Sequence, residues 1–225
     1  EEEKLYVANL AEVNKELQEL YDLEGSDKMQ ILKLLTRLRQ LCLEPRLVYD
    51  NIDQPSSKLK ACMELIKTMQ ENKQKVLLFS SFTSVLDLIA EECQKAGITY
   101  YMLTGSTNKE DRRELVSRFQ KDDTTVFLIS LKAGGTGLNL TSAEAVIHFD
   151  PWWNVSAQNQ ATDRAYRIGQ KNNVQVFNLV MKDSVEEKII ELQKRKKELA
   201  DMFVENNSGG LSQMSKEDIL SLFTM

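Results

Sequence analysis

The sequence predicts an α/β protein: a parallel sheet with helices on both faces, preceded and followed by helical segments. Two observations predict this fold class. Short apolar runs of strand length alternate with amphipathic helical stretches between residues 75 and 180, and such alternation is typical of a doubly wound sheet. Of the 225 residues, 42% are hydrophobic and 28% are charged, the balance of a globular protein that buries its core without disulfides or metal.

Residues 1 to 50 are predicted to be helical. The stretches LYVANLAEVNKELQEL and MQILKLLTRLRQLCL repeat apolar residues at intervals of three and four, which is the period of an amphipathic helix. EGSD at residues 24–27 separates the two helices, and DQPSS at residues 53–57 is a linker signal. We therefore expect a helical segment over residues 1–54 that leads into the sheet domain.

The sheet domain is expected over residues 55–182. Strands are predicted at residues 75–80, 99–104, 126–130, 145–150 and 174–180. SKLKACMELIKTMQEN is predicted to form a helix ahead of the first strand. SVLDLIAEECQKAG is predicted to form a helix after it, with Gly97 at the C′ position. Thr107 and Glu110 have the spacing of a capping box for a helix through Phe119.

The last part of the chain, residues 183–225, is again predicted to be helical. Ser184 and Glu187 form a second capping box, which starts a long charged helix that ends at about residue 204. NNSGG breaks this helix, and SKEDILSLF is expected to form a short closing helix.

Composition limits the class of protein. Cys42, Cys62 and Cys93 show no C-x-x-C spacing, and His148 is the single histidine, so we expect free thiols in a reducing compartment and no zinc site. No run of 18 apolar residues is present, so no membrane span is expected. The chain opens on Glu-Glu-Glu, and we expect it to be part of a longer protein.

The net charge of −5 is distributed unevenly. Residues 1–30 contain nine acidic and three basic residues, whereas residues 157–197 contain nine basic and five acidic ones. A basic segment in an acidic chain fits a solvated helix face or an anion-binding surface, and the distribution alone leaves both open.

Short segments follow four of the predicted strands, and small and polar residues fill the first three of these segments. They read SSF, GST, LKAGGTGLN and PWWN, and ligands of parallel sheets bind beyond the carboxyl ends of the strands. Small residues allow backbone N–H groups to approach phosphates closely. Ordinary strand ends also carry turn residues, so it is the four segments together that indicate a phosphate-bearing ligand at this edge.

The glycine-rich segment KAGGTGLNL is not a dinucleotide fingerprint. G-x-G-x-x-G would need glycine where Leu140 stands, and seven residues between Gly137 and Ala145 are too few for a crossover helix. The phosphate loop G-x-x-x-x-G-K-[ST] is also absent from the sequence. A nucleotide-hydrolysing function would therefore need its phosphate loop from elsewhere.

Three residues near the fourth strand are interpreted separately. Of the adjacent Trp152 and Trp153, one is expected to pack in the core and the other to be available for nucleic acid or a neighbouring domain. The alternative is that both cover an apolar edge. His148 lies within an apolar strand, and we expect a buried neutral histidine without chemistry.

The segment QATDRAYRIGQ, residues 160–170, places Gln160, Arg164 and Arg167 at i, i+4 and i+7, on one face of a predicted helix. A guanidinium presents a rigid fork that matches phosphate oxygens. Two of them with Gln160 could grip a triphosphate. Surface salt bridges are the alternative, but Asp163 is adjacent to Arg164 and points elsewhere around the helix, so it cannot neutralise both arginines.

These residues resemble the motifs of Swi/Snf-type helicase-like ATPases, and the resemblance covers nearly the whole chain. DPWWNVSAQNQATDRAYRIGQKNNVQVFNLV is similar to motif VI, SLKAGGTGLNLTSAEAVIHFD to motif V, and KVLLFSSFTSVLDLI to motif IV. YYMLTGSTNKEDRRELVSRF looks like the motif that follows motif IV. LRQLCLEPRLV resembles the start of the family's second lobe, but Glu44 stands where the family usually has histidine or asparagine.

The resemblance implies the second of two RecA-like lobes of the P-loop NTPase type, with ATP bound between the lobes. Arg164 and Arg167 would be arginine fingers that reach ATP on the first lobe, with Gln160 helping to place them. Gly135 and Gly137 would line the nucleotide interface. ATP and Mg²⁺ would be held mainly by the first lobe, since this chain has no Walker A or Walker B motif.

The resemblance further implies contacts with the backbone of double-stranded DNA, without reading of sequence. The residues expected to make them are Ser80, Ser81, Thr104, Gly105, Ser130, Lys132 and Trp153. The C-terminal helix resembles the family's bracing segment. Its basic run Lys194, Arg195, Lys196 and Lys197 could contact DNA, contact the first lobe or be solvated.

The function implied is that of a double-stranded-DNA-dependent ATPase and translocase, inactive as an isolated lobe. We expect a monomer that is cytoplasmic in a bacterium or nuclear in a eukaryote. Two alternatives stay open: a RecA-like module that binds protein or nucleic acid without hydrolysis, and an RNA-unwinding relative.

Overall fold

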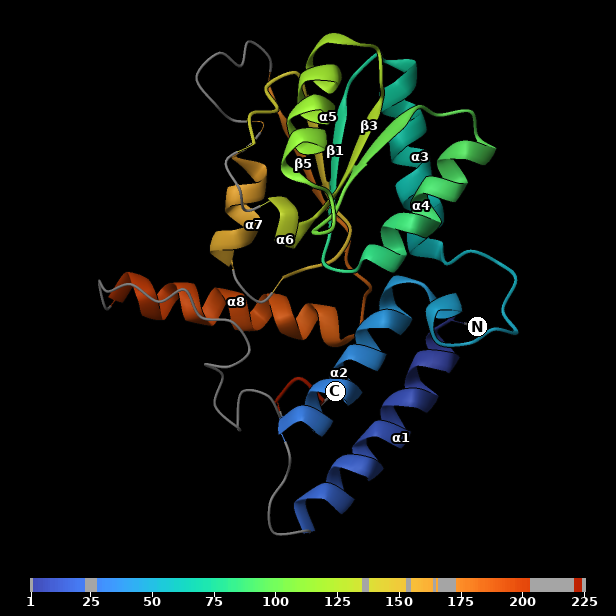
Figure 1. Cartoon of the computed structure of the whole chain (residues 1–225). Coiled ribbons are helices and arrows are strands. Elements are labelled where there is room, and N and C mark those ends of the chain that lie inside the picture. Colours follow the sequence, from blue (N-terminus) through green and yellow to red (C-terminus); the bar gives the residue numbers. More distant parts are fainter. Residues whose placement is uncertain are drawn as a thin grey trace. The chain divides into compact units, whose positions relative to one another are not determined.

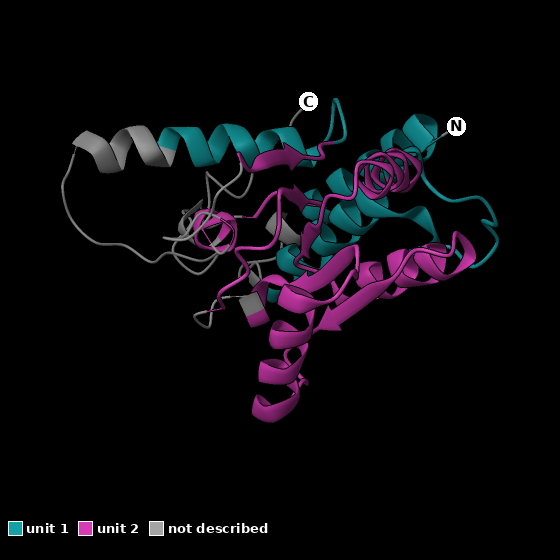
Figure 2. Cartoon of the chain, turned by 90° about the horizontal axis from the view of Figure 1, so that it is seen from above, with its two compact units in different colours: residues 1–58, 181–225 teal, residues 59–180 magenta. Residues whose placement is uncertain are grey.

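The computed structural model describes residues 2–22, 28–134, 138–152, 155–163, 165, 173–202 and 221–223. The chain divides into two compact units, shown in teal and magenta in Figure 2. Unit 1 combines Glu1–Lys58 with Met181–Met225, and unit 2 is Leu59–Val180. The helical segments before and after the sheet, which the sequence suggested as separate regions, thus belong to one unit.

Unit 2 is built on a five-stranded sheet in which all the strand pairs are parallel, as the sequence predicts. The strands are β1 (Val76–Ser80), β2 (Tyr100–Leu103), β3 (Val126–Ser130), β4 (Ala145–His148) and β5 (Gln175–Asn178), in the order β2-β3-β1-β4-β5. β4 and β5 are shorter than predicted. The central strand β1 pairs with β3 on one side and β4 on the other, and every residue of β1 is buried.

Helices cover both faces of this sheet (Figure 1). α3 (Ser57–Glu71) and α4 (Thr83–Lys95) lie on one side, and α5 (Lys109–Lys121), α6 (Leu131–Gly134) and α7 (Val155–Thr162) lie on the other. α6 is a single turn directly after β3, in a segment that the sequence suggested as loop.

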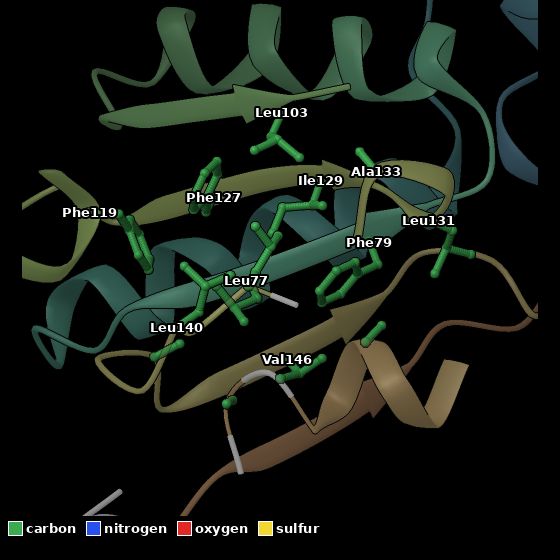
Figure 3. Packing of buried hydrophobic residues seen from close by; sticks show 14 of the residues in the cluster. Leu77, Phe79, Leu103, Phe119, Phe127, Ile129, Leu131, Ala133, Leu140 and Val146 are labelled. Carbon is green, nitrogen blue, oxygen red and sulfur yellow. The ribbon is translucent and has the colours of Figure 1, made fainter. Parts of the chain in front are cut away.

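The core under α5, α6 and α7 shows the period of two that a strand imposes. Leu77 and Phe79 alternate along β1 toward this face, and Phe127 and Val146 are the register partners of Leu77 in the neighbouring strands. Figure 3 shows these side chains with Phe119 of α5 in one apolar cluster. Residues of α5, α6 and α7 all pack into this one cluster, so the three helices are held against the same face of the sheet.

The end of α4 confirms the predicted role of Gly97. Gly97 has a φ of 67°, and its N–H donates to Gln94 O at 3.1 Å while Ile98 N–H donates to Cys93 O at 2.8 Å. These two bonds form a Schellman motif, which needs a left-handed residue at C′.

The predicted capping box at Thr107 is wrong by one residue. Asn108 is the N-cap of α5, and its Oδ1 accepts hydrogen bonds from the N–H groups of Glu110 at 3.0 Å and Asp111 at 2.9 Å. Thr107 Oγ1 instead accepts from Thr104 N–H at 3.1 Å. Thr107 therefore holds the loop that ends β2, and the adjacent asparagine caps the helix.

Unit 1 contains α1 (Glu2–Asp22), α2 (Lys28–Leu43), a short 3₁₀ helix at Pro45–Leu47 and α8 (Val185–Met202). α8 begins at the predicted second capping box. Ser184 Oγ accepts from Glu186 N–H at 3.2 Å, but the Glu187 carboxylate accepts from Asp183 N–H, one residue earlier than a capping box requires. The predicted closing helix lies largely outside the described residues.

Buried polar contacts join the helices of unit 1. Lys58 Nζ lies 2.6 Å from both carboxylate oxygens of Glu186, and these side chains are 7% and 1% exposed. Tyr6 accepts through its hydroxyl from Val185 N–H at 2.7 Å. Glu44 is also buried, and it accepts from the Arg46 guanidinium and from Ser56 N–H at 3.0 Å. Glu44, which stands where the family usually has histidine or asparagine, thus accepts a hydrogen bond at each of its two carboxylate oxygens.

None of the described helices combines the length and the hydropathy that a membrane span needs.

Candidate functional site at the carboxyl edge of the sheet

A buried aspartate joins the loops that follow β1 and β4. Phe149 N–H donates to Phe79 O at 2.9 Å, so pairing continues beyond β4. Asp150, 1% exposed, then accepts at Oδ1 from Ser80 Oγ at 2.7 Å and from Ser81 N–H at 3.0 Å, and at Oδ2 from the Ser81 hydroxyl. A buried carboxylate is stable only when several donors satisfy it. The two loops are therefore fixed to each other.

Two of the residues predicted to contact DNA, Ser80 and Ser130, have buried side chains. Ser80 is 0% exposed and Ser130 is 4% exposed. Ser80 Oγ bonds to Asp150 and accepts from Phe82 N–H at 3.2 Å, and Ser130 Oγ accepts from Ala133 N–H at 3.4 Å. Both hydroxyls are buried and bonded within the chain, so in this structure neither side chain is open to a phosphate. Ser81 is half-buried, with its hydroxyl on Asp150.

Three other predicted DNA contacts lie at the surface of this edge. Gly105 is exposed, and a Cβ at this position would have no atom within 4 Å. Lys132 is exposed on α6. Thr104 is partly exposed, and its Oγ1 is 2.8 Å from Ser106 Oγ. These positions are accessible to a ligand that lies across the ends of β2 and β3.

α7 leads toward the predicted arginines but ends earlier than expected. Its last residue is Thr162; Asp163 N–H still donates to Asn159 O at 2.8 Å, whereas Ala165 N–H donates to Thr162 O at 3.1 Å. This change from a four-residue to a three-residue spacing marks the end of α7, and Arg164 and Arg167, the two arginines of the predicted helical face, lie outside the described residues. Gln160 is exposed on the last turn of α7.

Five predicted site residues lie outside the described residues: Arg164, Arg167, Gly135, Gly137 and Trp153. In the basic run of α8, Lys194 and Arg195 are exposed, and the side chains of Lys196 and Lys197 are not among those described. Trp152 is half-buried against the apolar cluster, which agrees with the expectation that one tryptophan of the pair packs.

Two polar contacts that the sequence did not predict hold α7 to the sheet. His148 Nε2 lies 2.9 Å from Thr162 Oγ1, and Gln158 Nε2 donates to Asn178 Oδ1 at 2.9 Å. Trp152 N–H also donates to Gln158 Oε1 at 3.3 Å. In the sequence, the position of His148 and Asn178 at the ends of two strands indicated that they could make such contacts. Their partners, Thr162 and Gln158, depend on how α7 packs on the sheet and could not be read from the sequence.

His148 is the buried neutral histidine that the sequence predicts. It is 2% exposed, and its ring stacks on Phe79 with centroids 5.7 Å apart. Burial lowers the pKa of His148 to about 4, although the nearby Asp150 charge acts in the opposite direction. The imidazole is therefore uncharged at neutral pH.

A basic hollow of about 640 Å³ lies beside α5, and the sequence reasoning did not single it out. Its basic lining residues are Lys109, Arg112 and Arg113, and Leu138 and Asn139 also line it. Arg112 Nη1 donates to Ala133 O at 3.4 Å, which connects α5 with α6. In the sequence, the DRR triplet at residues 111–113, in the first turns of α5, could have indicated this basic hollow. Elsewhere in the described part of the chain, no three His, Cys, Asp or Glu side chains gather as a metal site.

Comparison with known proteins identifies the family. Residues 57–169 match the helicase conserved C-terminal domain. A protein of Mycoplasma pneumoniae, described as an uncharacterized ATP-dependent helicase, is 38% identical over 92% of this chain. The ATP-dependent helicase rhp16 of Schizosaccharomyces pombe is 41% identical over 75% of this chain. The chain spans 20% of the length of each of these two proteins.

The fold agrees with the sequence match. The Sulfolobus solfataricus SWI2/SNF2 ATPase core, solved in complex with double-stranded DNA, superposes with a TM-score of 0.76 at 31% identity. That alignment covers 97% of this chain and 47% of the other. The five-stranded parallel sheet and the matched residues 57–169 agree with that core. The chain therefore belongs to the helicase conserved C-terminal domain family, as the C-terminal RecA-like lobe of a Swi/Snf-type helicase-like ATPase.

Proposed function

We propose that this chain is the second motor lobe of an ATP-dependent translocase on double-stranded DNA. The observation that carries the proposal is the family match over residues 57–169, because this range includes both the glycine-rich segment and the arginine segment. The fixed carboxyl edge described above gives such a lobe a rigid surface to present to its ligands. The protein would work in the cytoplasm of a bacterium or the nucleus of a eukaryote.

On the nucleotide side, Arg164 and Arg167 would complete an active site whose ATP and Mg²⁺ are held mainly by the first lobe. Charge that develops on the γ-phosphoryl oxygens would meet two fixed guanidinium groups. In other NTPases such a finger contributes roughly 10³ to 10⁵ in turnover. Gln160, Gly135 and Gly137 would line the same interface. An isolated second lobe would then have no turnover of its own.

On the DNA side, Gly105, Lys132 and Thr104 would contact phosphates of one strand, with Ser81 contributing through its backbone. The basic hollow at Lys109 and its neighbouring arginines supports this proposal, because it adds positive charge close to the same edge. Phosphate contacts carry no sequence information, so binding would fall with salt and vary little with sequence. The lobes would close around ATP, open after hydrolysis, and move the protein along the duplex as a monomer.

The test is ATP turnover by the full-length protein, with and without duplex DNA, for wild type and Arg167→Ala. We expect DNA to stimulate the wild type, and Arg167→Ala to lose at least about 10³ of turnover while it still binds DNA. Arg118→Ala is the matched control, because Arg118 is a 57% exposed arginine that pairs with Glu114 on α5.

Other outcomes would change the proposal in defined ways. Normal turnover in Arg167→Ala would mean that the arginines have a structural or DNA-binding role. An absence of ATP turnover in the full-length wild type would favour the non-hydrolysing binding module. Stronger stimulation by RNA than by duplex DNA would favour the RNA-unwinding relative.

A further inference from the structure

The basic hollow beside α5 has the dimensions of a ligand site. Its volume is about 640 Å³, and ligand-binding clefts generally measure roughly 300–1,000 Å³. Much of its lining comes from one face of α5, because Lys109, Arg112, Arg113 and Val116 are spaced as i, i+3, i+4 and i+7. A single continuous helix therefore presents these four side chains to the hollow together.

The segment that supplies Leu138 and Asn139 to the hollow is held against α5 by the side chain of Gln120. Gln120 Nε2 donates to Asn139 O at 2.7 Å, and Gln120 Oε1 accepts from Ser142 N–H at 3.0 Å. The lining is thus fixed on two elements of unit 2 before any ligand binds. A ligand that enters a fixed site loses less free energy to ordering than one that must first assemble its site.

The hollow combines an apolar surface with positive charge. Leu138 is 6% exposed and belongs to the apolar cluster of the sheet, and Val116 packs against the same cluster. Lys109 and Arg113 are exposed residues of the same lining. A ligand that matches both features carries negative charge next to an apolar group.

The positive charge of the hollow is not neutralised within the part of the chain that the structure describes. None of the described lining residues is acidic. Lys109 and Arg113 form no ion pair with a described residue, whereas Glu114, which follows Arg113, pairs with Arg118 at 3.8 Å between Oε1 and Nη1. Charge complementarity therefore selects an anionic partner.

An acidic peptide satisfies both requirements better than duplex DNA does. A duplex presents its phosphates on a stiff, convex surface, so the cations attract it without any apolar group reaching Leu138 or Val116. A peptide is flexible enough to place one bulky apolar side chain in a hollow of this size while neighbouring carboxylates meet the cations around it. Arginine clusters recognise acidic segments in this way, because a guanidinium binds a carboxylate with two parallel hydrogen bonds.

We propose that the basic hollow is a docking site for an acidic segment of a partner protein. One apolar side chain of that segment lies against Leu138 and Val116, and the carboxylates that flank it pair with Lys109 and Arg113. The inference goes beyond the proposed function, because docking needs neither ATP nor the first lobe.

The test is fluorescence anisotropy with the full-length protein and a short fluorescein-labelled peptide of aspartate and glutamate around one central phenylalanine. A second peptide has serine in place of the phenylalanine. We expect the phenylalanine peptide to bind about tenfold more tightly, because its ring is removed from water in the hollow. Its affinity should fall as the salt concentration is raised, since the carboxylates face exposed cations.

Substitutions in the hollow identify where the peptide binds. Arg113→Gln and Lys109→Gln should each weaken binding of the phenylalanine peptide about threefold, and the double variant about tenfold, since exposed ion pairs contribute modestly and independently. Val116→Ala should weaken binding of the phenylalanine peptide about threefold and leave that of the serine peptide unchanged, because only the ring contacts this side chain.

Arg118→Gln is the matched control. Arg118 is 57% exposed on the same helix, but it is not among the residues that line the hollow. Both peptides should therefore bind this variant as they bind the wild type. Urea unfolding of each variant shows whether a loss of binding occurs in folded protein.

The inference is overturned if the two peptides bind with equal affinity, because the hollow is then only a positive surface of the kind that duplex DNA also uses. It is overturned if Arg118→Gln weakens binding as much as Arg113→Gln, because charge anywhere on α5 is then sufficient. It also fails if neither peptide binds at low salt, or if Val116→Ala affects both peptides equally. ATP turnover enters none of these measurements, so a failure of the proposed function leaves the result unchanged.

Discussion

Ser80, Ser130 and Asp150 show how polar residues at strand ends can serve the fold instead of a ligand. Ser80 and Asp150 are 70 residues apart in the sequence, and they meet because β1 and β4 are neighbours in the sheet. Strand-end position alone suggests a surface role for both serines. The sequence shows no sign of which strands are adjacent, and that adjacency decides whether such a hydroxyl points to solvent or to a buried carboxylate.

His148 gives a prediction for the dependence of stability on pH. Its pKa is about 4 in the folded chain, compared with about 6.5 for an unperturbed histidine. Protonation below pH 6.5 therefore favours the unfolded chain. Above pH 6.5 His148 is neutral in both states and does not affect the free energy of unfolding. As the pH falls from 6.5 toward 4, the unfolded chain takes up the proton first, and the free energy of unfolding decreases by an amount on the order of 3 kcal/mol.

The measurement is urea unfolding of wild type and His148→Phe between pH 7 and pH 4. Carboxylates titrate in both proteins, so the difference between the two curves isolates the histidine. We expect the wild type to lose more stability than the variant over this interval. Parallel curves for the two proteins would contradict the buried neutral state.

At the scale of elements, the sequence predicts well those features that depend on local pattern. The five apolar runs became five parallel strands, and Gly97 ends α4 where its left-handed conformation is needed. The start of α5 shifted by one residue, because Thr107 and Asn108 are both good caps and the bond of Thr107 to Thr104 N–H decides between them.

Two glycines provide a matched pair of variants. Gly97 has a φ of 67°, so Gly97→Ala should cost roughly 1 kcal/mol of unfolding free energy. Gly105 lies in open space outside the left-handed region, so Gly105→Ala should leave stability unchanged. Urea unfolding tests both expectations. Weaker DNA binding by Gly105→Ala at unchanged stability would support a close backbone contact with phosphate. An equal loss of stability in both variants would contradict the expectation that only Gly97 needs the left-handed conformation.

At the scale of the whole molecule, the segments on either side of the sheet domain in the sequence form one compact unit. The buried pair Lys58–Glu186 joins residues 128 positions apart within that unit. Removing one partner of this pair is expected to lower the free energy of unfolding. Lys58→Met leaves a carboxylate that is 1% exposed without its cation, and this should cost roughly 3 to 5 kcal/mol of unfolding free energy.

The double variant Lys58→Met with Glu186→Gln should recover much of that loss, because glutamine still accepts from Met181 N–H, as Glu186 does at 2.7 Å. Lys95→Met is the control, because Lys95 pairs with Glu92 at 2.8 Å but is 64% exposed, and surface pairs contribute about 1 kcal/mol or less. Similar urea midpoints for Lys58→Met and Lys95→Met would contradict the importance of the buried pair.

The strand order β2-β3-β1-β4-β5 also has a consequence for biosynthesis. β1 is the first strand to be made, yet its neighbours are the third and fourth, which end at Ser130 and His148. The nascent chain must therefore carry the apolar segment VLLFS with both edges open while the next 45 residues up to Val126 emerge, and one edge stays open until Ala145 follows. Unpaired apolar strands are the segments that aggregate. During translation the centre of this lobe is thus its most vulnerable part and the natural place for a chaperone to bind.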